Sequence, residues 1–179
     1  MNNPSVDLWA LDEVHFQQYG SRFRMWIPPE EKNPILLHHP TRKSVGYFGA
    51  VRLRDGKFVY QREADKFNGE SFFAFLKNIR QRASRAKRKV VLISDNARYH
   101  HARLHKPWRE DNKMFFALEF LPPYSPELNP IERIWKLVRR RCLHNRYFPT
   151  LDDVIICVEN QFDNWSNASE DLRKLCVIV

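Results

Sequence analysis

Three acidic residues stand at positions from which a folded chain could bring them together. Asp12 follows the apolar run 8–11, Asp95 follows the strand-like run 90–94, and Glu132 follows a proline-rich segment, PPYSPELNP at 122–130. Such runs predict buried strands, whose ends are rigid mounts at the edge of a sheet. The proline-rich segment predicts a stiff loop that delivers Glu132 onto the first turn of a helix. We therefore expect the three carboxylates to form one site.

Carboxylates grouped in this way are typical of metal-dependent phosphodiester chemistry. Mg²⁺ and Mn²⁺ prefer oxygen ligands and take only a few of them from the protein. A pair of such ions, roughly 4 Å apart, activates the attacking oxygen and stabilises the leaving oxygen. The chain carries 30 Lys and Arg against 21 Asp and Glu, and this net charge of +9 favours a polyanionic partner. The pattern therefore indicates a nucleic-acid substrate.

Each acidic residue also has a purely structural explanation. Glu132 fits a capping box with Asn129 and an i, i+4 ion pair with a lysine. Asp95 could cap a turn after its strand. Asp12 is adjacent to Glu13, and only one of the two faces the site because side chains alternate along a strand. The residue pattern alone leaves these alternatives open.

Four further residues are candidates for contacts with nucleic acid. They are His100 near Asp95 and three basic residues that follow Glu132 on its helix, Lys136, Arg139 and Arg140. Cations at such positions neutralise phosphates, which adds affinity without sequence preference. A plain surface histidine and a solvated helix face are the alternatives. His101 and His105 have zinc-binding spacing, but no third ligand accompanies them.

The predicted elements alternate between strands and helices. We expect a strand over 6–16 and a β-hairpin over 44–53 and 57–63, whose Asp-Gly turn is a strong hairpin signal. Apolar periodicity predicts a helix over 68–83, a strand over 89–95, a helix over 97–110 and a strand over 114–121. Helices that begin at 130 and at 150 follow, the second with a capping box formed by Thr150 and Asp153, and then a short helix over 168–176.

A single domain, 1–179, is the expected organisation. Its length suits one compact unit, and neither an internal repeat nor a low-complexity linker interrupts it. The segment 17–43 is rich in proline and basic residues and is predicted to be an extended arm or long loop. Segments of this kind usually serve a function.

Cysteine spacing and hydropathy indicate the cellular environment. Cys142, Cys157 and Cys176 are far apart and form no CxxC pair, so we expect free thiols and neither a zinc knuckle nor a disulfide framework. The N-terminus does not resemble a signal peptide, and no run approaches the roughly 20 apolar residues of a membrane span. The expected protein has no membrane contact and is cytoplasmic.

These motifs resemble the catalytic domain of DDE-type transposases of the mariner superfamily, in particular its bacterial insertion-sequence branch. The resemblance covers roughly residues 6–166, and its motifs are LPPYSPELNPIERIW at 121–135, LISDNARYH at 92–100 and the short LDE at 11–13. It implies an α/β, ribonuclease-H-like fold, with a mixed five-stranded sheet flanked by helices. It also implies a catalytic, metal-binding triad of Asp12, Asp95 and Glu132 that holds two Mg²⁺ or Mn²⁺ ions.

The function that the resemblance implies is DNA transposition. Such an enzyme hydrolyses phosphodiesters at transposon ends and transfers the strand into target DNA, here as a homodimer at the bacterial nucleoid. The arm 17–43 looks like a region that makes subunit or DNA contacts in relatives. The alternatives are another ribonuclease-H-like nuclease or resolvase, and an inactive, domesticated DNA-binding remnant.

Two departures from the family pattern accompany the resemblance. The segment between Asp95 and Glu132 is slightly longer than in close relatives, which a loop insertion would explain. The helix-turn-helix region that precedes the catalytic domain in full transposases is expected to be absent, since the chain starts at the first strand. A fragment, a split reading frame and an inactive copy therefore all stay open.

Overall fold

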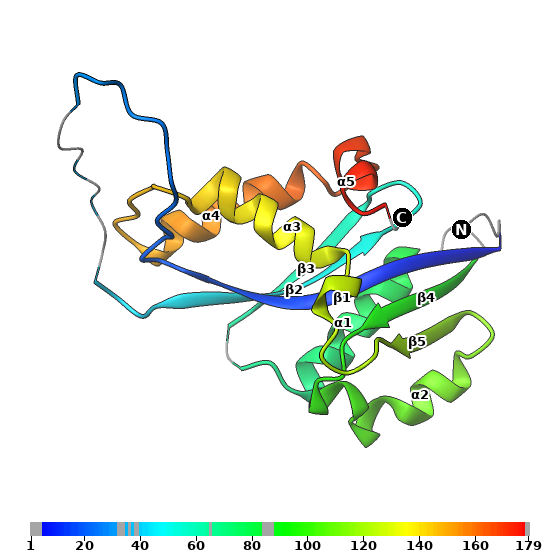
Figure 1. Ribbon diagram of the computed structural model, residues 1–179. Helices are drawn as coiled ribbons and strands as arrows, with labels where there is room; N and C mark the ends of the chain where they lie inside the picture. The colour runs from blue at the N-terminus through cyan, green and yellow to red at the C-terminus, as the bar shows by residue number, and fades with distance from the viewer. Residues whose placement is uncertain are drawn as a thin grey trace.

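The fold is organised around β1, Val6–Gln17, the central strand of a five-stranded sheet. The computed structural model describes residues 5–31, 35, 37, 40–64, 66–83 and 88–177. The other strands are β2 (Ser44–Arg52), β3 (Phe58–Glu63), β4 (Lys89–Ser94) and β5 (Phe116–Phe120). Their order across the sheet is β3-β2-β1-β4-β5 (Figure 1).

The pairing of β1 places two of the predicted acidic residues at one edge of the sheet. β1 is antiparallel to β2 and parallel to β4, while β2–β3 is antiparallel and β4–β5 parallel. The last parallel pair joins Ala10 to Ile93. Asp12 and Asp95 each lie two residues beyond this pair, so they are side by side, with Asp12 still inside β1 opposite Gly49 of β2 and Asp95 just after the end of β4. The predicted mixed, five-stranded sheet is confirmed.

Helices cover both faces of the sheet (Figure 1). On one face, α1 (Gly69–Ala83) and α2 (Lys106–Asp111) pack over Trp9 and Leu11 of β1. On the other face, α3 (Ile131–Val138), α4 (Leu151–Asp163) and α5 (Glu170–Leu175) pack over Ala10 and Val14. Alternate residues of β1 therefore point into two separate cores. None of the helices among the described residues is long and apolar enough to cross a bilayer.

Several local signals are confirmed by the structure. The hairpin turn contains Gly56 at φ +70°, a conformation that suits glycine. The capping box of α4 forms, because Thr150 Oγ1 accepts from the Asp153 N–H over 3.2 Å and Asp153 Oδ2 accepts from the Thr150 N–H over 3.0 Å. All three cysteines are free, as expected.

The predicted helix over 97–110 is wrong. The chain instead forms two 3-10 turns, η2 (Arg98–His101) and η3 (Arg103–His105), before the short α2. Ala102 between the turns is extended, with φ −54° and ψ 139°, and this conformation interrupts any continuous helix. As a result His100 and His105 both become fully buried.

The chain between β1 and β2 extends away from the sheet (Figure 1). Its described residues 22–31, 35, 37 and 40–43 form neither helix nor strand. The base of this segment is fixed by Asn145, whose side chain accepts from the Phe23 N–H and donates to the Phe23 carbonyl, each over 2.9 Å. Further out, Trp26 is 81% exposed.

Candidate active site

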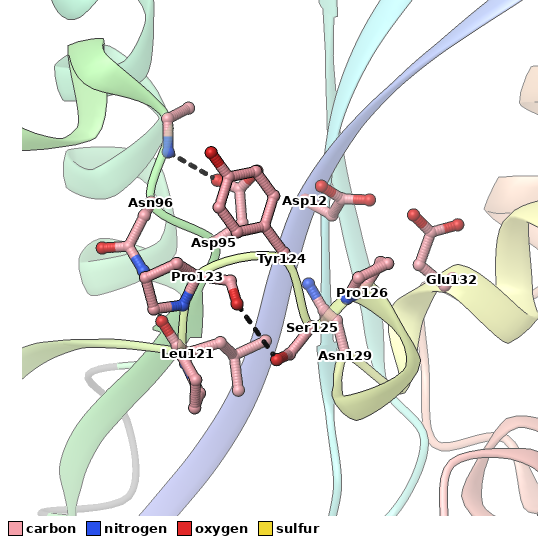
Figure 2. A pocket seen from close by; sticks show the side chains of 12 residues that line it. Asp12, Asp95, Asn96, Leu121, Pro123, Tyr124, Ser125, Pro126, Asn129 and Glu132 are labelled. Atoms are coloured by element: carbon pink, nitrogen blue, oxygen red, sulfur yellow. Dashed lines mark hydrogen bonds between the residues drawn. The ribbon is translucent and has the colours of Figure 1, made fainter.

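A cavity of about 490 Å³ opens at the edge of the sheet where β1 and β4 present Asp12 and Asp95. Glu132 and the loop 121–126 line the same cavity (Figure 2). The three acidic residues come from β1, from the turn after β4 and from the first turn of α3. The structure therefore brings together the three carboxylates that the sequence analysis selected.

Asp12 is held by an indole from α3. Trp135 Nε1 donates to Asp12 Oδ2 over 2.9 Å, and Trp135 is itself buried. Gly49, the β2 partner of Asp12, makes space for this indole, since a Cβ there would lie 2.3 Å from Trp135 Cη2. A glycine opposite the acidic residue is thus a requirement of the packing. In Figure 2 the Asp12 carboxylate points toward Glu132.

The electrostatic surroundings of Asp12 favour a bound cation. Burial, together with the charges of Glu13 and Glu132, raises the pKa of Asp12 to about 7, against the lowering effect of the Trp135 hydrogen bond. The ionised form therefore lacks a countercharge. A divalent cation would supply it, and three carboxylates are hard oxygen ligands of the kind that Mg²⁺ and Mn²⁺ prefer. The residues present fit such a metal.

The pKa of Asp95 is shifted in the opposite direction to that of Asp12. His100 Nδ1 lies 2.9 Å from Asp95 Oδ1, and this hydrogen bond lowers the pKa of Asp95. His100 Nε2 lies 2.7 Å from Glu13 Oε1. Burial lowers the pKa of His100, but the hydrogen bonds to Asp95 and Glu13 outweigh it and raise the pKa to about 9. His100 is therefore buried between two carboxylates, which favour its protonated form.

This arrangement corrects the prediction for His100 and explains Glu13. His100 is fully buried behind Asp95, with its ring 4.2 Å from that of Phe72, so it offers no surface to DNA. Asp12 and Glu13 point to opposite faces of the sheet, as strand alternation requires. Asp12 lines the cavity, whereas Glu13 reaches His100. Ligand atoms of Glu13, Asp95 and His100 all lie within 4.8 Å of one another.

The other two histidines do not form a zinc pair. His101 stacks on Phe120 at 4.2 Å and lies 3.2 Å from Asn96 Oδ1. His105 is fully buried, 5.6 Å from the ring of Phe72. Within the described residues, neither belongs to a group of three potential metal ligands.

Glu132 stands on a helix that is tied to β1. α3 begins at Ile131 with Pro130 at the N-cap position and no side-chain cap, one residue later than predicted. The Asn129 amide, expected to cap the helix, instead donates to the Leu11 carbonyl over 3.0 Å. Its Oδ1 is 3.5 Å from the Ile131 nitrogen, at the limit of a hydrogen bond. Asn129 therefore mainly links α3 to β1 through this hydrogen bond to the Leu11 carbonyl.

The predicted basic residues line a second cavity beside α3, of about 430 Å³. Lys136 and Arg140 are exposed, while Arg139 is half-buried with its guanidinium 5.5 Å from the Phe16 ring. Phe23, at the base of the arm, forms an apolar part of the lining. The result is a cationic surface with an aromatic patch.

The fold and the cavity define a class of protein, and comparison with known proteins agrees. The chain belongs to the DDE superfamily endonucleases, whose family model matches residues 7–155. The sheet and its helices correspond to the ribonuclease-H-like fold of the Mos1 strand transfer complex, with a TM-score of 0.66 at 20% identity over 94% of this chain and 50% of that chain. The expected family and fold are thereby confirmed.

Two further proteins are similar to this chain. The Mos1 mariner paired end complex with Mn has a TM-score of 0.66 at 17% identity, over 94% of this chain and 51% of that chain. The uncharacterized protein y4pE/y4sA of Sinorhizobium fredii is 46% identical over 67 residues, which are 37% of this chain and 45% of the relative. The chain spans about half the length of these proteins.

Proposed function

We propose that this chain is the catalytic domain of a DNA transposase. It would hydrolyse a phosphodiester at a transposon end and join the freed 3′-hydroxyl to target DNA. The observation that carries the proposal is the single cavity lined by Asp12, Asp95 and Glu132. Membership of the DDE endonuclease family and a fold shared with a Mos1 strand transfer complex support it.

In this proposal Asp12, Asp95 and Glu132 hold two divalent cations, Mg²⁺ or Mn²⁺. Bound there, such ions activate the attacking oxygen and neutralise charge that develops at the phosphate. Asp95 is ionised at neutral pH, since its contact with His100 lowers a pKa that is ordinarily already well below 7. Asp12, whose pKa is raised to about 7, would hold such a cation in its ionised form. Trp135 keeps the Asp12 carboxylate in place throughout.

The cationic surface beside α3 is proposed to hold DNA. Lys136, Arg139 and Arg140 follow Glu132 on the same stretch of chain, so phosphates that they contact lie next to the carboxylates. We further propose that the acting form is a homodimer, in line with the paired end complex of Mos1. The identity shared with a Sinorhizobium fredii protein supports a bacterial source. Action at the nucleoid would follow from a DNA substrate in a bacterial cell.

A strand-transfer assay tests this function. A labelled DNA duplex with a pre-cut 3′ end is incubated with target DNA and Mg²⁺, and joined products are resolved on a gel. The wild-type chain should form joined products, and Asp95→Asn should form none while it retains DNA binding.

Other outcomes would assign other functions. Cleavage of uncut DNA without any joining would identify another nuclease of this fold. DNA binding without cleavage or joining, in Mg²⁺ and in Mn²⁺, would identify an inactive remnant. Undiminished joining by Asp95→Asn would contradict the proposed role of the three carboxylates.

A further inference from the structure

His100 bridges two carboxylates that come from different parts of the chain. Its Nε2 lies 2.7 Å from Glu13 Oε1 and its Nδ1 lies 2.9 Å from Asp95 Oδ1. The side chain of His100 is fully buried and that of Glu13 is 10% exposed, whereas that of Asp95 is 52% exposed. The bridge therefore runs from the interior of the α1 side of the sheet to the edge of the cavity.

The direction of both hydrogen bonds follows from which groups can donate and which can accept. A carboxylate oxygen accepts, so a ring nitrogen that bonds to one donates. Charge-assisted hydrogen bonds of this length are the stronger kind. His100 Nδ1 also lies 3.1 Å from Ser94 Oγ and 3.2 Å from the Asp95 carbonyl oxygen, and these contacts hold the ring in the same place. Phe72, with its ring 4.2 Å away, and Tyr99, with its ring 4.5 Å away, pack against the imidazole. The ring thus has little freedom to rotate.

The contacts of Asp95 leave one of its oxygens available. His100 Nδ1 and the Ala97 N–H both contact Oδ1, at 2.9 Å and 3.1 Å. Among the residues that the structure describes, no hydrogen bond falls on Oδ2. One oxygen is therefore occupied by groups that fix the orientation of the carboxylate, and the other is left for a cation in the cavity that Asp95 lines.

A direct metal-ligand role for His100 conflicts with this geometry. Both ring nitrogens already face a carboxylate oxygen at hydrogen-bond distance, so neither is open to a cation in the cavity. The cluster of Glu13, Asp95 and His100 is compact enough to suggest an ion site. Its contacts are those of a hydrogen-bonded chain in which the imidazole of His100 links the carboxylates of Glu13 and Asp95.

We propose that Glu13 and His100 are positioning residues, which orient Asp95 toward the metal without binding it. The inference rests on the proposed function, because it assumes that Asp95 is a metal ligand. It also gives the Asp12–Glu13 pair on β1 two separate tasks. Asp12 faces the cavity, while Glu13 acts through the opposite face of the sheet on the second carboxylate.

Mn²⁺ binding to the whole chain tests this inference without an activity assay. His100→Phe keeps an aromatic ring beside Phe72 but removes both donors. Its Kd for Mn²⁺, measured by calorimetry, should rise about 10- to 100-fold, as is usual when a partner of a metal ligand is lost. His105→Phe is the matched control, because His105 is equally buried and also contacts Phe72. Its Kd should stay within about twofold of wild type.

Glu13 variants provide a second test should His100→Phe fail to fold. Glu13→Gln retains an oxygen that accepts from His100 and should lose about threefold to tenfold in Mn²⁺ affinity, whereas Glu13→Ala should lose more. Electron spin-echo spectroscopy of the Mn²⁺ complex should show no coupling to a directly bound imidazole nitrogen.

Three results would overturn the proposal. They are an unchanged Mn²⁺ Kd in folded His100→Phe or in both Glu13 variants, an equal loss in His105→Phe, and a directly bound nitrogen that disappears in His100→Phe. If the wild-type chain bound no Mn²⁺, the proposed function would fail together with this inference. If the wild type bound Mn²⁺ and lost it in Asp95→Asn while His100→Phe bound normally, the inference alone would fail.

Discussion

Trp135 donates its indole N–H to Asp12 over 2.9 Å from a position one helical turn after Glu132. One short helix therefore carries an acidic residue of the cavity and also holds another acidic residue in place. Asn129, just before the helix, donates to the Leu11 carbonyl next to Asp12. These two hydrogen bonds fix α3 against β1, so the distance between Asp12 and Glu132 is set by packing and does not depend on a flexible loop.

Trp135→Phe should weaken metal binding more than it weakens the fold. The phenyl ring retains most of the packing but leaves Asp12 without its donor, and the pKa of Asp12 should rise further. We expect a loss of about tenfold in Mn²⁺ affinity at pH 7, measured by calorimetry. Trp165→Phe is the control, since this buried tryptophan packs on Phe58 in the same core. An equal loss in the control would contradict the account.

Gly49→Ala should displace Trp135. The added Cβ would lie 2.3 Å from Trp135 Cη2, and a buried overlap of this size costs about 1 to 3 kcal/mol in the free energy of unfolding. Denaturant titration measures this loss. In the double variant with Trp135→Phe the overlap is reduced, so the two effects should not add. If the losses in the free energy of unfolding of the two single variants simply added in the double variant, the indole of Trp135 would not be the group that the added Cβ overlaps.

Asp12→Asn should stabilise the metal-free protein at neutral and higher pH. The folded-state pKa of Asp12 is near 7 and the unfolded value near 3.8, so the folded protein binds more protons between these values and loses stability as the pH rises. Removing the charge should raise the free energy of unfolding by about 2 to 4 kcal/mol above pH 7. Near pH 4 the free energy of unfolding should change little.

Thermal unfolding in EDTA from pH 4 to 8 measures this effect. The gain in Tm of Asp12→Asn over wild type should grow across the range. The variant should also lose the Mn²⁺-induced rise in Tm that the wild type shows. A Tm difference that is constant with pH would contradict the raised pKa of Asp12.

Lys136→Ala and Arg140→Ala should each weaken DNA binding to the same extent for unrelated sequences. Each lost phosphate contact should also reduce the slope of log K against log salt by about 1. Fluorescence anisotropy from 50 to 200 mM salt (roughly the range in which such slopes are measured) provides both values. Lys113→Ala is the control, because Lys113 is exposed just before β5, away from the cavity edge. If the slope of log K against log salt changed equally in Lys113→Ala, DNA binding would not be confined to the surface beside α3.

The strands were predictable because they depend on local patterns. Local patterns also drew attention to the three carboxylates, but the family resemblance was needed to select Asp12 over Glu13 and to join the three into one site. The apolar run before Asp95 correctly placed this residue just after a strand, whereas β1 continues past Asp12 to Gln17. Parallel pairing of β1 with β4 then brings the two residues side by side. The capping box of α4 was equally local. Such signals need no knowledge of distant contacts.

The supporting residues were not predictable because they depend on contacts far apart in the sequence. His100 looked like a surface residue until two 3-10 turns replaced the expected helix and buried it against α1. Trp135 fitted an ordinary apolar stripe, and only the fold shows its hydrogen bond to Asp12. The adjacent pair Asp12–Glu13 was the one available signal, because strand alternation sends Glu13 to the opposite face.

Asp12, Asp95 and Glu132 are proposed to form one metal site for phosphodiester chemistry. Crystals soaked in millimolar MnCl₂ and measured at the manganese absorption edge test it most directly. We expect an anomalous peak in the cavity, bonded to Asp12 and Asp95, and we expect this peak to be lost in Asp95→Asn. An empty cavity in the wild type at saturating Mn²⁺, or a peak bonded to His100 in place of Asp12, would contradict it.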